Sequence, residues 1–161
     1  MLRKIRLLTT TVILAVVSMA TQAQNANPFI GAWDIDLRAS NFGSVTAPAN
    51  MSRTYFDHGD GTYTYMVITT GVDGGLSGTT AHYSYSGEQY PIANFNQNIR
   101  ATISYNRIND TTVEYTVSVD GEVQQIGAKF VSPNYQQLTI SIQFPNSDQE
   151  NQLLIFNKRR P

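Results

Sequence analysis

The chain has 161 residues, no cysteine and a formal net charge of −1, from 11 basic and 12 acidic residues. No run of basic residues precedes Lys158-Arg159-Arg160, so neither nucleic acid nor an anionic membrane surface is an expected partner. The chain cannot form a disulfide, and its two histidines cannot supply a three-histidine zinc site. We therefore expect no metal and no cofactor.

The first 23 residues have the pattern of a secretory signal peptide. Three basic residues precede an apolar run from Leu7 to Ala20, and small and polar residues follow up to Ala23. The apolar run is shorter than the about 20 residues that a bilayer span needs, which argues against an uncleaved membrane anchor. We expect residues 24–161 to remain as one periplasmic or extracellular domain without a membrane span, with eight basic against twelve acidic residues.

Residues 24–161 have the sequence pattern of an all-β protein. Short runs rich in tyrosine, threonine, valine and isoleucine alternate with turn signals, and almost no helical periodicity is present. In chain order the predicted strands are 29–37, 51–57, 62–70, 79–86, 98–108, 111–119, 122–131, 136–144 and 151–157. In "TVEYTVSVDG", for example, Val113, Tyr115, Val117 and Val119 share one face, which predicts a strand buried on one side and wet on the other.

The connections between these strands are short and predict an up-and-down meander. Asp120-Gly121 is a strong signal for a two-residue hairpin turn, and the glycine-rich "GVDGGLSG" suits a flexible hairpin tip. An open meander would leave exposed edges, and closure into a barrel of about eight or nine strands removes them. A two-sheet sandwich is the alternative, with "EQYPIANFNQN" as the crossing connection.

Trp33 is the only tryptophan and lies in the first predicted strand, two residues after Gly31. In a regular strand it shares a face with Ile35 and Leu37, while Asp34 faces water. We expect the indole to plug the closed end of a barrel, with Gly31 allowing close backbone approach. A core tryptophan in another β-fold would need the same residues.

The segment Gly31-Ala32-Trp33, the meander after it and the arginines after the last strand resemble the lipocalin-type barrels. In that family the tryptophan packs at the closed end beneath an arginine from just past the last strand, which implies that Arg159 or Arg160 covers Trp33 here. The stretches "GAWDIDLRASNF", "YSYSGEQYPI" and "TVEYTVSVDGEV" are similar to small secreted bacterial lipocalin-like proteins of no established activity. The resemblance implies a lipocalin-like barrel.

Tyrosines dominate the predicted inner faces of the strands. Together with Trp33 and Arg53, the candidate ligand-binding residues are Tyr63, Tyr65, Tyr83, Tyr105 and Tyr115. Their rings either fill the barrel or line a cavity for a partly apolar ligand, and both readings remain open. Arg53 shares a face with Tyr55 and is a candidate anchor for an anionic group.

No catalytic group is predicted. The stretch "FDHGDG" brings Asp57, His58 and Asp60 together, but this composition is also what a tight hairpin requires. His82 alternates with Tyr83, so it faces solvent if the tyrosine faces inward; lining a pocket is the alternative.

Three functional hypotheses follow from these observations. The first is a secreted protein that binds or sequesters a small, partly apolar ligand inside the barrel, without catalysis. The second is an envelope interaction protein with a filled barrel that binds another protein through the loop Gly71 to Gly78. The third is an enzyme that uses His58 or His82 with an aspartate, which requires a cleft shared by the two groups.

Overall fold

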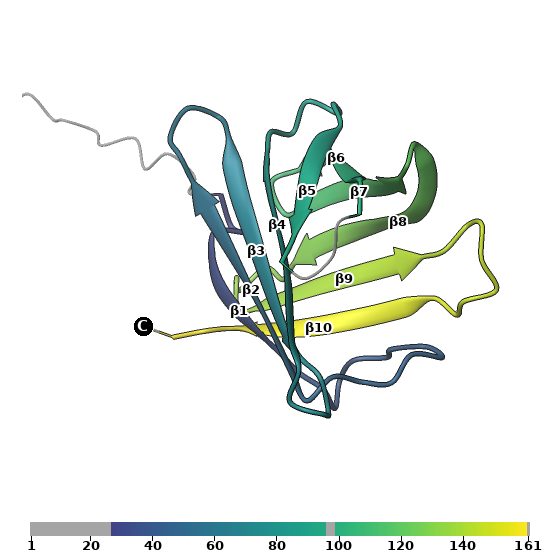
Figure 1. Cartoon of the computed structure of the whole chain (residues 1–161). Helices are drawn as coiled ribbons and strands as arrows, with labels where there is room; N and C mark the ends of the chain where they lie inside the picture. The colour runs from purple at the N-terminus through teal and green to yellow at the C-terminus, as the bar shows by residue number, and fades with distance from the viewer. Residues whose placement is uncertain (1–26, 96–98, 161) are drawn as a thin grey trace, which may run out of the picture.

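Ten antiparallel strands form a closed barrel in the computed structural model, which describes residues 27–95 and 99–160 (Figure 1). The strands are β1 (Gly31–Ile35), β2 (Asn50–Asp57), β3 (Tyr63–Thr70), β4 (Leu76–Tyr83), β5 (Tyr90–Asn94), β6 (Ala101–Asn109), β7 (Thr112–Val119), β8 (Glu122–Val131), β9 (Gln137–Gln143) and β10 (Gln152–Lys158). Each strand pairs with its neighbours in sequence, and β1 also pairs with β10. The predicted up-and-down barrel is therefore confirmed, and the sandwich alternative is wrong.

The described part of the chain contains no helix with the length and apolar character needed to cross a membrane. The predicted signal peptide, residues 1–23, lies outside the described residues.

The expected count of eight or nine strands is wrong, because the segment treated as a loop or crossing contains β5. This strand begins at Tyr90 and includes Pro91, which has no N–H to donate to a neighbouring strand. It makes only two residue pairs with β4 and three with β6. A proline and such short pairing explain why the sequence pattern did not reveal the strand.

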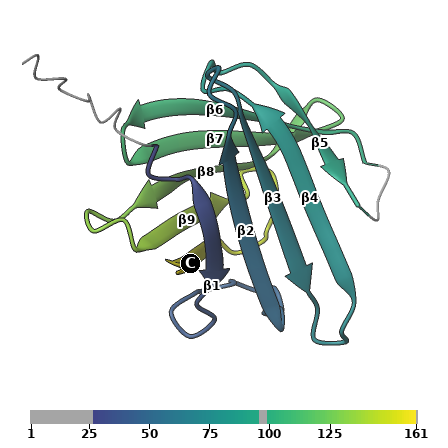
Figure 2. The same ribbon diagram turned by 90° about the vertical axis from the view of Figure 1, so that its left-hand side faces the viewer.

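The barrel has two walls that cross each other. Strands β1 to β4 form one wall and β6 to β9 the other, as Figures 1 and 2 show from two directions. Buried side chains alternate along the strands as predicted, for example Leu138, Ile140 and Ile142 on β9. The predicted hairpin turn joins β7 and β8, with positive φ at Asp120 (49°) and Gly121 (88°), as a type I′ turn requires.

Trp33 is fully buried next to the seam where β1 meets β10. Its Nε1 donates a hydrogen bond of 2.8 Å to the Phe29 carbonyl. The cation over its ring is Lys158, with Nζ 5.0 Å from the ring centroid, so the expectation that Arg159 or Arg160 covers Trp33 is wrong. The reason is strand alternation: Lys158 pairs with Trp33 and shares its face, whereas Arg159 lies on the other face and binds Asp34.

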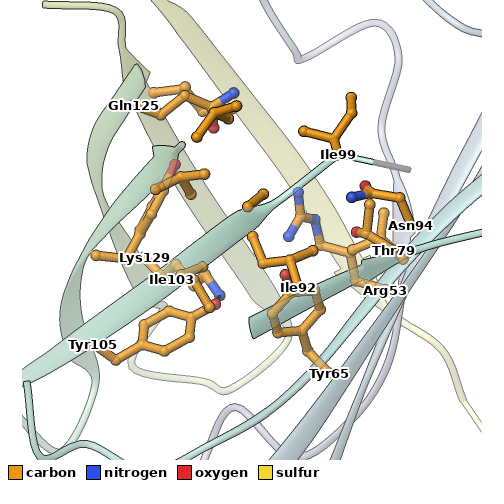
Figure 3. Close-up of a pocket in the computed structure, with 16 residues that line it drawn as sticks. Arg53, Tyr65, Thr79, Ile92, Asn94, Ile99, Ile103, Tyr105, Gln125 and Lys129 are labelled. Atoms are coloured by element: carbon orange, nitrogen blue, oxygen red, sulfur yellow. Dashed lines mark hydrogen bonds between the residues drawn. The ribbon is translucent and has the colours of Figure 1, made fainter. Parts of the chain in front are cut away.

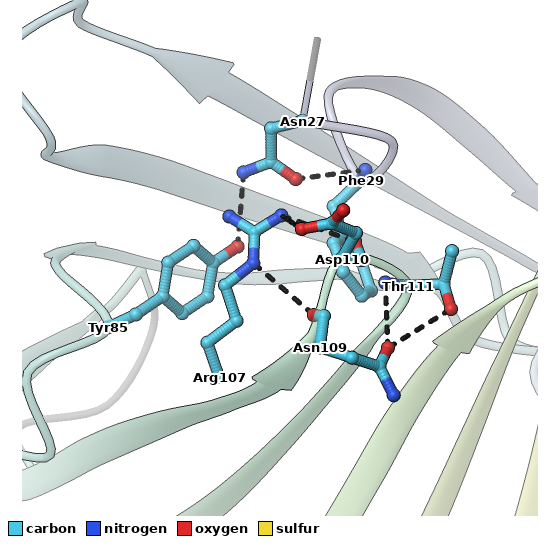
Figure 4. A network of polar contacts seen from close by, with 7 residues as sticks. All are labelled: Asn27, Phe29, Tyr85, Arg107, Asn109, Asp110 and Thr111. Atoms are coloured by element: carbon cyan, nitrogen blue, oxygen red, sulfur yellow. Dashed lines mark hydrogen bonds and ion pairs between the residues drawn. The ribbon is translucent and has the colours of Figure 1, made fainter. Parts of the chain in front are cut away.

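The segment before β1 lies across one end of the barrel (Figure 4). Phe29 is fully buried there, and the Asn27 side chain donates a hydrogen bond to the Tyr85 hydroxyl. On the same end, the Arg107 guanidinium lies 5.3 Å from the centroid of the Tyr85 ring. Phe29 and Trp33 therefore close this end of the barrel together, whereas the sequence pattern predicted the tryptophan alone. Leu37 does not join this cluster: β1 ends at Ile35, and Leu37 is exposed in the following turn.

Gly127 of β8 has no room for a side chain, because Tyr115 packs directly over it. The Tyr115 hydroxyl donates a hydrogen bond of 3.0 Å to the Ser141 carbonyl, and a Cβ at Gly127 would lie 2.0 Å from that carbonyl and 2.8 Å from the hydroxyl. We expect Gly127→Ala to lower the free energy of unfolding by about 1–3 kcal/mol, the usual cost of overpacking, as measured by urea denaturation.

Gly75→Ala in the β3–β4 turn is the matched control. The nearest atom to a Cβ at Gly75 is Oδ1 of the exposed Asp73 side chain, at 3.1 Å, so a shift of a few tenths of an ångström accommodates the added methyl group. We expect a change within about 0.5 kcal/mol for this variant. Equal destabilisation by the two substitutions would contradict the packing of Tyr115 over Gly127.

Candidate functional site

A cavity of about 290 Å³ lies inside the barrel between the two walls (Figure 3). Its apolar lining comes mainly from aliphatic side chains of β3, β6, β7 and β9, among them Val67, Ile103, Val117 and Ile142. Its polar lining consists of Arg53, Thr79, Asn94, Gln125, Lys129 and three tyrosines. Ile99 also lines the cavity and is 42% exposed, so the cavity reaches the surface between β5 and β6.

Arg53 of β2 projects into this cavity. In the barrel wall it lies between Trp33 of β1 and Val67 of β3, and its guanidinium carbon is 5.4 Å from the centroid of the Phe156 ring. Its Nε and the neighbouring Tyr55 hydroxyl are buried without a hydrogen-bond partner among the described residues. An arginine keeps its charge under all ordinary conditions, so the cavity contains a permanent cation with unused hydrogen-bonding capacity.

Lys129 of β8 enters the cavity from the opposite wall (Figure 3). The residue is buried, and its Nζ donates a hydrogen bond of 2.5 Å to the Tyr105 hydroxyl. Four tyrosine rings surround the amine, with centroids at 4.3 Å (Tyr105), 4.9 Å (Tyr55), 5.4 Å (Tyr65) and 5.6 Å (Tyr115). Burial, and secondly the positive charge of Arg53, lower the pKa of Lys129 well below its ordinary value.

Arg53 and Lys129 have no acidic partner inside the barrel. All twelve acidic residues lie in the described ranges, and none of them is buried. A buried charge without a counter-charge is costly, so these two side chains lower the stability of the barrel. The interior is therefore positively charged and accepts an anionic group with a net electrostatic gain.

The tyrosine hydroxyls in the lining stay protonated; that of Tyr115 donates to the Ser141 carbonyl, and those of Tyr65 and Tyr105 can donate to a ligand. Burial raises the pKa of Tyr65 to about 12, and it raises the pKa values of Tyr105 and Tyr115 as well. The cavity thus combines an apolar surface with neutral hydroxyl groups and a guanidinium.

The structure divides the predicted site residues into two groups. Arg53, Tyr65, Tyr105 and Tyr115 line the cavity. Trp33, Tyr63 and Tyr83 lie outside the lining of this cavity.

Tyr63 and Tyr83 instead pack together with Tyr85 at the end closed by Phe29. The Tyr63 ring lies 5.8 Å from Tyr83 and 4.9 Å from Tyr85, centroid to centroid. Tyrosine rings therefore fill one end of the barrel and line a cavity in the rest.

The sequence did not point to four polar residues of the lining, namely Thr79, Asn94, Gln125 and Lys129, and of these Lys129 is the one that can carry a charge. The signal was present in "GAKFV", where Lys129 and Val131 lie two residues apart and so share one face of β8. A lysine on such a face is usually assumed to be at the surface, because lysine is almost never fully buried.

The two histidines lie on the outer surface of the barrel and outside the cavity lining. Their ring centroids are 5.1 Å apart, and the Thr64 hydroxyl lies between them, 2.9 Å from His58 Nε2 and 3.3 Å from His82 Nδ1. His82 faces solvent, as its alternation with Tyr83 predicts. In the described part of the chain, no group of three or more histidine, aspartate or glutamate side chains is arranged to hold a metal ion.

The sequence matches no protein-family model and no curated protein. The fold is similar to that of a Schistosoma mansoni fatty acid binding protein in complex with arachidonic acid, with a TM-score of 0.59 and 11% identity over 83% of this chain and 97% of that chain. It is also similar to a variant of the fluorescent protein UnaG, with a TM-score of 0.57 and 10% identity over 83% of this chain and 98% of that chain. The chain therefore has the lipocalin-like barrel fold of the fatty acid binding proteins.

The lowered pKa of Lys129 makes the free energy of unfolding depend on pH. The pKa of Lys129 is lower in the folded protein than the 10.5 of an exposed lysine, so between these two values the unfolded state binds more protons. The free energy of unfolding should then rise with pH in that window. We expect Lys129→Met to be more stable than the wild type by roughly 1–4 kcal/mol at about pH 7, with a smaller difference at about pH 9.5.

The measurement is urea denaturation of both proteins at several pH values, kept below about 10, where tyrosine ionisation begins in the unfolded chain. Lys158→Met is the control, because Lys158 lies over Trp33 and outside the cavity lining. A wild type that is more stable than Lys129→Met at neutral pH would show that Lys129 has a compensating partner.

Proposed function

We propose that the protein binds a small amphipathic anion inside the barrel, outside the cytoplasm, without chemical conversion. The observation that carries this proposal is the buried guanidinium of Arg53, which faces the cavity together with the Lys129 amine and without a buried carboxylate. An incoming carboxylate or similar group would supply the missing counter-charge and hydrogen-bond acceptor for Arg53.

The ligand would lie with its apolar part against the aliphatic lining and its anionic group at Arg53. Burial of apolar surface contributes about 25 cal/mol per Å², and the tyrosine hydroxyls would orient the polar end. The cavity of about 290 Å³ is at the lower end of the volumes of small-molecule sites. This volume favours a medium-length acyl chain or a single aromatic ring with an acidic group.

Two further observations support the proposal. The fold is similar to that of the fatty acid binding protein in complex with arachidonic acid. Binding of an anionic amphipathic ligand inside the barrel would agree with the positive charge of Arg53 in the cavity. The sequence of residues 1–23 supports export, which would make the protein a periplasmic or extracellular carrier or scavenger.

The alternative of a protein partner rests on the loop from Gly71 to Gly78, where Val72 is 73% and Leu76 is 65% exposed. That hypothesis expected a filled barrel, whereas the interior contains a cavity, so we favour a small ligand. An enzyme that uses His58 or His82 has less support, because both histidines lie outside the cavity lining.

The test compares two ligands of equal chain length, decanoate and decanol, by isothermal titration calorimetry. We expect decanoate to bind at least about tenfold more tightly than decanol, since only decanoate pairs with the buried cation. Arg53→Met should remove most of this preference and leave decanol binding little changed. The physical reason is that the variant keeps the apolar lining and loses the guanidinium.

Arg107→Met is the matched control, because Arg107 lies over Tyr85 at the other end of the barrel. This variant should bind decanoate like the wild type. Equal affinity for decanoate and decanol would contradict the role of the charge, and a failure of both ligands to bind would contradict the proposed function as a whole.

A further inference from the structure

The amine of Lys129 is held in an environment that is unusual for a lysine. Its Nζ lies inside a cage of four tyrosine rings contributed by β2, β3, β6 and β7, and its hydrogen-bond partner is the Tyr105 hydroxyl. The charged and titratable groups that face it are therefore these four tyrosines and Arg53. None of them is an acid that would hold the amine protonated at neutral pH.

The ring faces attract an ammonium, but burial of the amine and the positive charge of Arg53 outweigh them and favour the neutral amine, which is the nucleophilic form of lysine. A lysine that is desolvated and placed next to another cation is activated toward carbonyl compounds. Burial and the charge of Arg53 lower the pKa of Lys129, which raises the fraction of free amine at neutral pH. Arg53 and Lys129 thus differ in role, since Arg53 remains the permanent cation of the cavity.

The position of Lys129 makes this amine available to a bound molecule. Lys129 lines the same cavity as Arg53, and Figure 3 shows the two side chains entering from opposite sides. The apolar lining between them suits a hydrocarbon chain or ring. A ligand in this cavity would therefore place its polar end next to the Arg53 guanidinium in one orientation and next to the Lys129 amine in the other.

We infer that Lys129 captures amphipathic aldehydes in the cavity as a reversible imine. This inference rests on the proposed function in one respect, namely that the cavity admits amphipathic ligands. It adds a covalent mode of binding and a second ligand class, aldehydes, to the anions proposed above.

The step balances without an oxidant or a cofactor. The Nζ lone pair attacks the carbonyl carbon, and the electrons of the C=O double bond move to oxygen, which gives a carbinolamine after a proton passes from nitrogen to oxygen. Loss of water then forms the C=N bond, so amine and aldehyde become imine and water. The Tyr105 hydroxyl, 2.5 Å from Nζ, stays protonated because burial raises its pKa, and it is in place to donate a hydrogen bond to the departing oxygen.

The test is reductive trapping of the purified protein with decanal and sodium cyanoborohydride near neutral pH, followed by peptide mapping. The chain has three lysines, Lys4, Lys129 and Lys158, so the modified site is identified directly. We expect one decyl group on Lys129, added at least about tenfold faster than on Lys158, because each unit of pKa depression raises the free-amine fraction about tenfold. Excess decanoate should slow the labelling of Lys129 and leave that of Lys158 unchanged.

Two variants make the assignment specific. Lys129→Met should lose the fast modification and stay folded, as its circular dichroism would show, while Lys158→Met should keep it. Labelling confined to Lys158, Lys4 or the terminal amine would overturn the inference, as would labelling of Lys129 that excess decanoate does not slow although decanoate binds the protein.

The outcomes for the two proposals are separable. Decanoate binding without modification of Lys129 would overturn the imine and leave the anion-binding function intact. Fast modification of Lys129 without decanoate binding would establish the imine and overturn the anion-binding function.

Discussion

The pairing of β1 with β10 closes the barrel, and the properties of the interior depend on this closure. Trp33 lies at the seam, paired with Lys158 on one side and with Arg53 on the other. All three side chains are on the inner face of the wall because residues directly opposite in paired strands point the same way. Closure therefore buries the indole and at the same time directs Arg53 into the interior.

The charge of the interior conflicts with the stability of the fold. Apolar side chains at positions 53 and 129 would complete the core, since the neighbouring lining is aliphatic and aromatic. Arg53 and Lys129 instead line a cavity that has no acidic side chain in its lining. The two side chains give the site different chemical properties. The Arg53 guanidinium stays charged and can pair with an anion, whereas the desolvated Lys129 amine tends to lose its proton and become nucleophilic.

Tyrosine has different roles at the two ends of the same barrel. Near the end covered by Phe29, the rings of Tyr63, Tyr83 and Tyr85 fill the space and exclude a ligand. Further along the barrel, Tyr65 and Tyr105 border the cavity and surround Lys129. The same residue type thus seals one end and supplies rings and hydroxyls to the site, and the level along the barrel axis decides which role a given tyrosine has.

The sequence by itself determined the strand alternation, most turns and the closed meander, because burial of one face and the φ requirements of tight turns are local constraints. It placed Arg53, Tyr65, Tyr105 and Tyr115 on inner faces correctly. It did not reveal β5, whose proline and short pairing weaken the local pattern.

Only the tertiary structure decided which inward side chains meet a cavity, since this depends on the level of each residue along a barrel assembled from distant strands. The same holds for the cation over Trp33 and for the amine caged by four tyrosines from four different strands. Alternation specifies the face of a side chain, but contacts across a barrel depend on the register of every strand around it.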